Sequence, residues 1–186
     1  MTTEQMMIWR PTLNKDKYKQ VVLFILNGAA NNPLLGKVKL FKLLYYVDFD
    51  HVENYDAPVT GDVYRKEMHG PFPSTGDAIL SEMKDEGLID YWQEEVRDNQ
   101  KYCFRAKRAP DESLLTRSEL KVLEQVVSKW ANHTREEIEN ATHGEAPWVA
   151  VEMGEEIPYT LAYYRSQPHE CDEDVPDAAL PTSKAH

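Results

Sequence analysis

The sequence predicts a mainly helical α+β fold: a winged-helix-like core that contains a small β-hairpin and is followed by additional C-terminal helices. Several segments place apolar residues at the i, i+3, i+4, i+7 spacing of a helix that buries one face. Another segment alternates apolar and polar residues beside a polar turn, which indicates a hairpin. The order helix, helix, extended segment, helix, hairpin is that of a winged helix. Such folds bind DNA or proteins, so the fold does not decide the function.

The first two helices begin the core. The first is expected from Asp16, which can cap its N-terminus, to Gly28. The second is expected to start near Gly36 and to run through Val47, and residues 56–58 break the helical pattern. Because it is apolar around most of its circumference after Lys42, it should be the central helix of the fold.

An extended segment, a turn and a third helix follow. Residues 59–68 are expected to be extended and lead into the turn 69–73, which contains two prolines. Residues 74–77 have the spacing of a capping box, with Asp in place of the usual Glu, and open the third helix. Gly87 stands where a left-handed residue would end that helix.

The second half of the chain begins with the hairpin. Strands are expected at 91–96 and 101–106, on either side of the polar turn 97–100. Two capping boxes come next, Thr116–Glu119 and Thr134–Glu137, and each is expected to begin a helix.

A short helix at 158–165 is expected to close the ordered part. Residues 166–186 combine five acidic residues and three prolines with few apolar residues, a composition that cannot support a core. We therefore expect an N-terminal arm at 1–15, one domain at 16–165 and a disordered acidic tail at 166–186.

The composition favours a soluble cytoplasmic protein. Hydrophobic residues make up 41% of the 186 positions and charged residues 28%, as is usual in globular proteins. The longest apolar run, Leu43–Val47, is too short to cross a membrane, and the first residues do not have the features of a signal peptide. Cys103 and Cys171 do not form a disulfide framework, and we expect reduced thiols.

The net charge of −11 conceals an asymmetry. Residues 1–42 carry seven basic and two acidic side chains, so the rest of the chain is strongly acidic. An acidic body disfavours nucleic-acid binding by the free protein, and the third helix carries Asp77, Glu82, Asp85 and Glu86, which a DNA groove would repel. The basic residues are either the solvated sides of two helices or a local DNA-binding face.

No group of residues predicts catalysis, a metal or a cofactor. The six histidines lack metal-ligand spacing, and the sequence has no glycine-rich phosphate loop. No Ser or Cys nucleophile with a plausible base is apparent, and His143 is interpreted as structural. We therefore expect a non-enzymatic protein that needs no cofactor.

Three motifs resemble those of one family. Residues 39–46, KLFKLLYY, resemble the KLxKLLYY signature of the SocA-like antitoxin domain, also called the Panacea domain. Residues 63–71 resemble its extended segment ending in an aromatic-Gly-Pro turn, with His69 where Tyr is commoner. The segment 123–148 resembles its closing pattern, so the resemblance covers about residues 17–150. The signature residues in this chain are Leu40, Leu43, Leu44, Tyr45, Tyr46, Pro71, Trp130, His143, Pro147 and Trp148.

The resemblance implies an antitoxin of a bacterial or phage toxin–antitoxin system. Such a protein would neutralise the toxin encoded by an adjacent gene, either by direct binding or as an adaptor that brings in a protease or chaperone. An acidic protein suits a basic toxin. The alternative is a winged-helix DNA-binding regulator that represses its own operon. The sequence does not indicate an oligomeric state.

The partner-binding residues are expected beside the signature. Tyr45, Tyr46 and Trp148 should lie in the core, and Gly70-Pro71 should meet a backbone requirement of the turn. Toxin contact is expected from exposed residues on the second helix and in the turn that follows it. These candidates are Lys39, Lys42, His69, Gly70 and Phe72.

Overall fold

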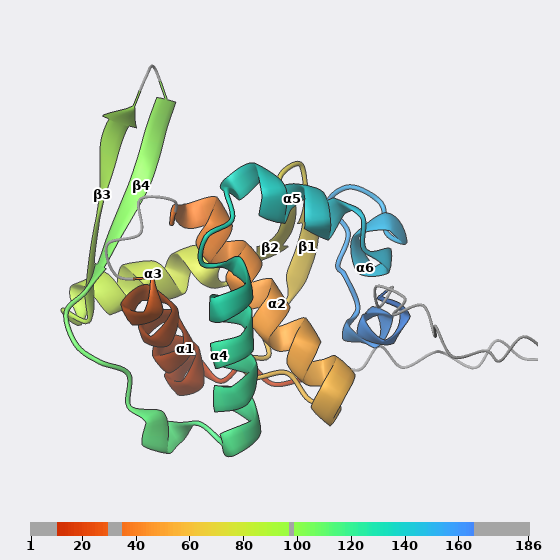
Figure 1. Ribbon diagram of the computed structural model, residues 1–186, viewed down its shortest axis with the longest axis horizontal. Coiled ribbons are helices and arrows are strands. Elements are labelled where there is room, and N and C mark those ends of the chain that lie inside the picture. The colour runs from red at the N-terminus through yellow and green to blue at the C-terminus, as the bar shows by residue number, and fades with distance from the viewer. Residues whose placement is uncertain (1–10, 30–34, 97–98, 166–186) are drawn as a thin grey trace, which may run out of the picture.

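The computed structural model describes residues 11–29, 35–96 and 99–165 and confirms the α+β class (Figure 1). The helices are α1 Lys15–Gly28, α2 Lys37–Tyr55, α3 Gly76–Asp85, α4 Arg117–Trp130, α5 Arg135–His143 and α6 Ala146–Val149, with the short 3-10 helices η1 Glu112–Leu114 and η2 Tyr159–Tyr164. The strands are β1 Tyr64–Glu67, β2 Gly70–Pro73, β3 Ile89–Val96 and β4 Asn99–Ala106. Residues 1–10 of the predicted arm and the whole predicted tail, 166–186, lie outside the described residues.

Helix α2 is the central element, as predicted. It packs against α1, α4, α5, β2 and η2, and most of its residues are buried because apolar side chains occupy all its faces. It runs to Tyr55 and ends at Asp56, which adopts the left-handed conformation (φ 60°), where the sequence predicts the break. Around Phe49, the rings of Tyr45, Tyr64 and Tyr159 pack at centroid distances of 4.3, 5.8 and 5.0 Å.

The strands form two separate antiparallel hairpins. In the first, Glu67 pairs with Gly70, so Met68 and His69 form the turn. Sequence analysis missed β2 because Pro71 and Pro73 argue against a strand. In the second hairpin, the pairing runs from Ile89 with Ala106 to Val96 with Asn99, which confirms the predicted hairpin. Figure 1 shows this hairpin standing away from the helical body.

The helix ends confirm most of the predicted signals. Thr116 and Thr134 both form complete capping boxes, and Gly87 adopts a positive φ of 71°. The predicted box at 74–77 is wrong: the N-cap of α3 is Thr75, whose side chain makes no capping hydrogen bond. The carboxylate of Asp62 instead accepts from the Thr75 backbone N–H at 3.2 Å.

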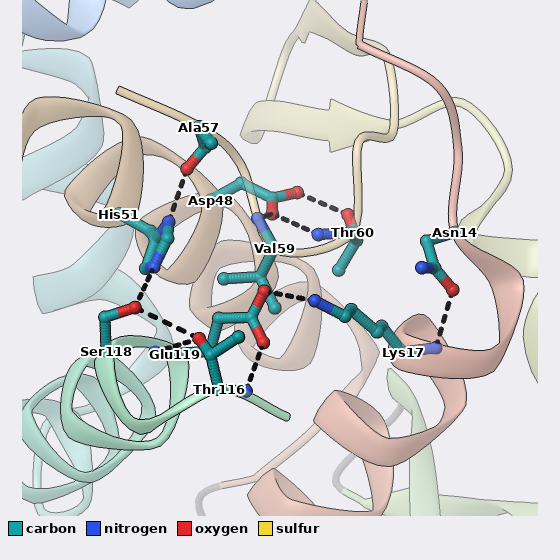
Figure 2. Close-up of polar contacts among 10 residues, drawn as sticks. All are labelled: Asn14, Lys17, Asp48, His51, Ala57, Val59, Thr60, Thr116, Ser118 and Glu119. Atoms are coloured by element: carbon teal, nitrogen blue, oxygen red, sulfur yellow. Dashed lines mark hydrogen bonds and ion pairs between the residues drawn. The ribbon is translucent and has the colours of Figure 1, made fainter. Parts of the chain in front are cut away.

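A buried carboxylate fixes the loop after α2. Asp48 is fully buried, and its Oδ1 accepts from the backbone N–H groups of Val59 (2.8 Å) and Thr60 (2.7 Å). Its Oδ2 accepts from the hydroxyl groups of Thr60, Tyr64 and Tyr159. Figure 2 shows the contacts with Val59 and Thr60. Burial raises the pKa of Asp48 to about 6, although these hydrogen bonds oppose the shift.

Arg165 ties the end of the described chain to α2. Its guanidinium donates to Asp50 Oδ1 at 2.6 Å and to Glu145 Oε1 at 3.2 Å. The hydroxyl of Tyr45 donates to the other oxygen of Glu145 at 2.8 Å. Burial raises the pKa of Glu145, and the positive charge of Arg165 opposes that shift. No helix in the part of the chain that the structure describes is long and apolar enough to cross a bilayer.

Candidate functional site

A cleft of about 590 Å³ opens between the start of α2, the β1–β2 turn, β4 and the start of α5. We call it the α2–α5 cleft. Its lining consists of Lys37, Val38, Phe41, Lys42, Glu67, Met68, His69, Gly70, Phe72, Gln100, Tyr102 and Arg135. Basic and aromatic side chains thus meet in one hollow, although they come from four elements far apart in sequence.

Lys42 belongs to the most deeply buried part of this lining, with only 2% of its surface exposed. Its ammonium group donates to the carbonyl oxygen of Pro71 at 2.8 Å. Gly70 covers it: a Cβ on Gly70 would lie 2.6 Å from Lys42 Cε and 2.8 Å from Thr142 Oγ1. Burial lowers the pKa of Lys42 to about 7; the negative charge of Glu139 opposes this shift, and the positive charge of Arg135 adds to it.

On one side of the cleft, the lining residues His69 and Arg135 form a polar cluster with Glu139. His69 Nδ1 lies 3.0 Å from Glu139 Oε1 and 3.1 Å from Arg135 Nη2. The Nε of Arg135 donates to Glu139 Oε2 at 3.4 Å. The side chains of His69 and Arg135 are about half exposed, at 53% and 52%, so both are accessible from solvent.

Aromatic rings form the other side. Phe41 and Phe72 pack edge to face with centroids 4.9 Å apart. The ammonium of Lys37 lies 5.1 Å from the Tyr102 ring centroid and 2.5 Å from Asp77 Oδ1. Lys37 is therefore held beside the aromatic wall by both a ring and a carboxylate.

Four of the five predicted binding residues meet in this cleft: Lys42, His69, Gly70 and Phe72. Lys39 does not. It is 1% exposed, and its ammonium donates to the carbonyl oxygens of Ala131 (3.1 Å) and His133 (2.6 Å), just beyond the C-terminus of α4.

The expected exposure of three candidates is corrected by the structure. Lys39 and Lys42 are buried, not exposed, because each ammonium group binds backbone carbonyls inside the fold. Phe72 is partly buried against Phe41. Gly70 has a φ of 94°, which agrees with the predicted backbone requirement of the turn.

Eight lining residues of the cleft were not predicted as binding residues: Lys37, Val38, Phe41, Glu67 and Met68, which lie near the predicted ones in sequence, and Gln100, Tyr102 and Arg135, which come from other segments. Lys37 stands two residues before the KLFKLLYY motif, and this closeness to the motif was the sequence signal that could have indicated it as a binding residue. Nothing local connects the hairpin or α5 to α2.

The signature residues lie mainly in the core, as expected. Tyr45 and Tyr46 are 0% and 1% exposed, and Trp130 stacks on Tyr46 with centroids 4.9 Å apart. His143 has a structural position, stacked on Trp148 at 4.1 Å. The ammonium of Lys66 lies 4.0 Å from the Trp148 ring centroid and donates a hydrogen bond to the carbonyl oxygen of Val151.

The basic residues near the N-terminus are largely paired within the fold. Lys17 Nζ lies 2.5 Å from Glu119 Oε1, a pair that Figure 2 shows, and Lys19 binds both Glu82 and Glu86. Lys15 also pairs with Glu82. These contacts occupy cations that a phosphate backbone would need, which disfavours the DNA-binding alternative.

One serine lies close to a histidine, contrary to the sequence analysis. Nε2 of His51 is 3.1 Å from Ser118 Oγ, while Nδ1 faces the carbonyl oxygen of Ala57 (Figure 2). Ser118 also lies 3.0 Å from the hydroxyl of Thr116, which caps α4. In a catalytic triad, a carboxylate next to the histidine stabilises its protonated form. The carbonyl oxygen beside His51 carries no charge and stabilises a protonated histidine less. We interpret the pair as a link between α2 and the start of α4.

The described residues offer no metal site: among them, no group of three or more His, Cys, Asp or Glu side chains is placed to hold an ion. The α2–α5 cleft instead has the composition of a binding surface, with aromatic side chains and an arginine in its lining.

Comparison with known proteins gives one match. The family model described as "Antitoxin SocA-like, Panacea domain" matches residues 40–149, more than half of the chain. Neither the curated proteins nor the solved structures contain a significant match. The matched range includes α2 from residue 40 onward, both hairpins and α5, and therefore every lining residue of the cleft except Lys37 and Val38.

Proposed function

The chain belongs to the family of SocA-like antitoxins with a Panacea domain, and from this premise we propose that it neutralises the toxic product of an adjacent gene by binding it. The family match carries the proposal. The site supports it, because a concave surface with aromatic and basic side chains suits a protein partner better than catalysis. We place the contact at the α2–α5 cleft, with Lys42, His69, Gly70 and Phe72 among the contact residues. Lys39 is assigned to the scaffold.

The proposal includes two routes to neutralisation. In the first, the antitoxin covers the toxin and blocks its activity in a stable complex. In the second, it is an adaptor that brings the bound toxin to a protease, and toxin abundance falls. Both routes require a physical complex in the cytoplasm. The oligomeric state of this complex is not part of the proposal.

Co-expression tests the proposal. The adjacent gene product should arrest growth when expressed alone, and this chain should restore growth while co-purifying with that product. Following the toxin level after synthesis is stopped separates the routes: it stays constant in direct neutralisation and falls in the adaptor route. A harmless neighbour, or rescue with neither complex nor toxin loss, contradicts the proposal.

A further inference from the structure

The α2–α5 cleft has a charge opposite to that of the whole protein. Its lining contains two permanent cations, Lys37 and Arg135, the titratable ammonium group of Lys42 and a single carboxylate, Glu67, whereas the chain carries a net charge of −11. Two other carboxylates, Asp77 and Glu139, pair with cleft cations but do not belong to the lining. The lining therefore carries more basic than acidic side chains in an otherwise acidic protein, and Lys37 and Arg135 are each paired with one carboxylate beside it.

The cations of the cleft retain hydrogen-bonding capacity. A guanidinium carries five N–H donors, and Arg135 uses its Nε toward Glu139 and Nη2 toward His69. An ammonium carries three donors, and Lys42 directs one to the carbonyl oxygen of Pro71. A planar guanidinium binds carboxylates through two parallel hydrogen bonds, which adds both strength and geometric specificity.

Apolar surface lies next to these cations. Phe72 and Tyr102 line the cleft and are only partly buried, and the side chain of Met68, in the β1–β2 turn, is among the most exposed large apolar groups of the described residues, at 74%. An occupant that only carried charge would leave this surface in water. An apolar side chain beside the charge would bury it, and burial of apolar area is the main favourable contribution to protein association.

We infer that the cleft binds an acidic residue of the toxin that has an apolar neighbour, with the carboxylate at Arg135 and the neighbour on Phe72 and Tyr102. This inference rests on the proposed function. A lysine or arginine of the toxin would meet like charges in the same place and would be disfavoured. A basic toxin surface remains compatible with the acidic faces outside the cleft, so the toxin's overall charge does not decide the contact.

Titration calorimetry with the purified product of the adjacent gene tests this inference. Arg135→Glu reverses the charge at an exposed position in the first turn of α5, where an acidic residue favours the helix dipole, so the variant should fold. Lys37→Glu is a second reversal, at the first residue of α2. The matched control is Lys107→Glu, which reverses a half-exposed lysine paired with Asp90 outside the cleft. Thermal melts of all three variants check folding.

We expect Arg135→Glu to weaken the affinity roughly 30-fold, the lower end for losing one partner of a desolvated charge pair, and Lys37→Glu to weaken it in the same direction. Lys107→Glu should stay within about twofold. On the toxin, replacing each surface Asp or Glu by Lys should identify one variant that loses affinity for the natural chain and recovers it with Arg135→Glu.

The outcomes separate the two proposals. If the natural chain binds the toxin but both cleft reversals bind as tightly as the Lys107 control, the inference is overturned and the proposed function stands. Tighter binding by the reversals also overturns it, because the occupant would then be basic. If the natural chain neither binds nor neutralises the toxin, the proposed function fails and the inference fails with it.

Discussion

Replacing Gly70 by alanine tests how tightly the turn closes over Lys42. Gly70 has a φ of 94°, in the left-handed region, where a non-glycine residue loses about 1 kcal/mol or more. A new Cβ would also lie 2.6 Å from Lys42 Cε and 2.8 Å from Thr142 Oγ1. Lys42 has little room to move, because it is buried and its ammonium group binds Pro71.

The chain offers a matched control for this substitution. Gly87 also has a positive φ, 71°, but a Cβ there would meet no heavy atom within 4 Å. Gly87→Ala should therefore lose only the backbone contribution, about 1 kcal/mol. Overpacking in a buried site adds about 1 to 3 kcal/mol, so Gly70→Ala should lose about 2 to 4 kcal/mol. The difference between the variants isolates the steric contribution above Lys42.

Urea unfolding followed by tryptophan fluorescence measures both losses, since the chain contains four tryptophans. At this size each kcal/mol lowers the melting temperature by about 2 to 4 °C, so the two variants are also distinguishable in thermal melts. Equal losses in Gly70→Ala and Gly87→Ala would refute the reasoning, because the turn would then have room for a side chain and Lys42 would not be confined beneath it.

Two further predictions concern buried ionisable groups. Because the pKa of folded Lys42 is about 7, below its ordinary 10.5, the unfolded chain binds more protons between these pH values and the stability of the natural protein should rise from pH 7 to pH 10. Lys42→Met should lose that rise in urea titrations at both pH values, and parallel profiles would count against a strongly shifted pKa. Asp48→Asn should destabilise the fold by about 2 to 4 kcal/mol at pH 7, because an NH₂ group replaces an oxygen that accepts three hydroxyl groups. Asp90→Asn is the control, at a half-exposed pair with Lys107, and an equal loss there would contradict the assigned role of the network.

Most of the elements were predictable because their signals are local. The central helix, the 91–106 hairpin and the capping boxes at Thr116 and Thr134 each depend on residues within one turn or one strand pair. The first hairpin was missed because prolines argue against strands, although β2 accommodates two of them. The fold class therefore follows from sequence patterns, and the strand pairing of a proline-rich turn does not.

The candidate site was predictable only in part. Lys39 and Lys42 share a helix face at i, i+3, and helical patterning assigns such lysines to solvent. Their acceptors are the carbonyls of Pro71, Ala131 and His133, which lie far away in the sequence, so no local pattern indicates the burial. For the same reason Tyr102 and Arg135 were not expected beside α2. Toxin contact by the cleft stays a prediction.

The contacts of Arg165 have a consequence for protein engineering. A chain cut before this residue would leave Asp50 and the partly buried Glu145 without the guanidinium of Arg165, and a carboxylate that loses its cation inside the fold is destabilising. A chain that keeps Arg165 retains this neutralisation and the cover that it gives the Tyr45 and Tyr46 rings, at 6.0 and 5.3 Å from their centroids. Shortened versions for crystallisation should therefore end after Arg165, and reporter proteins should be fused after this residue.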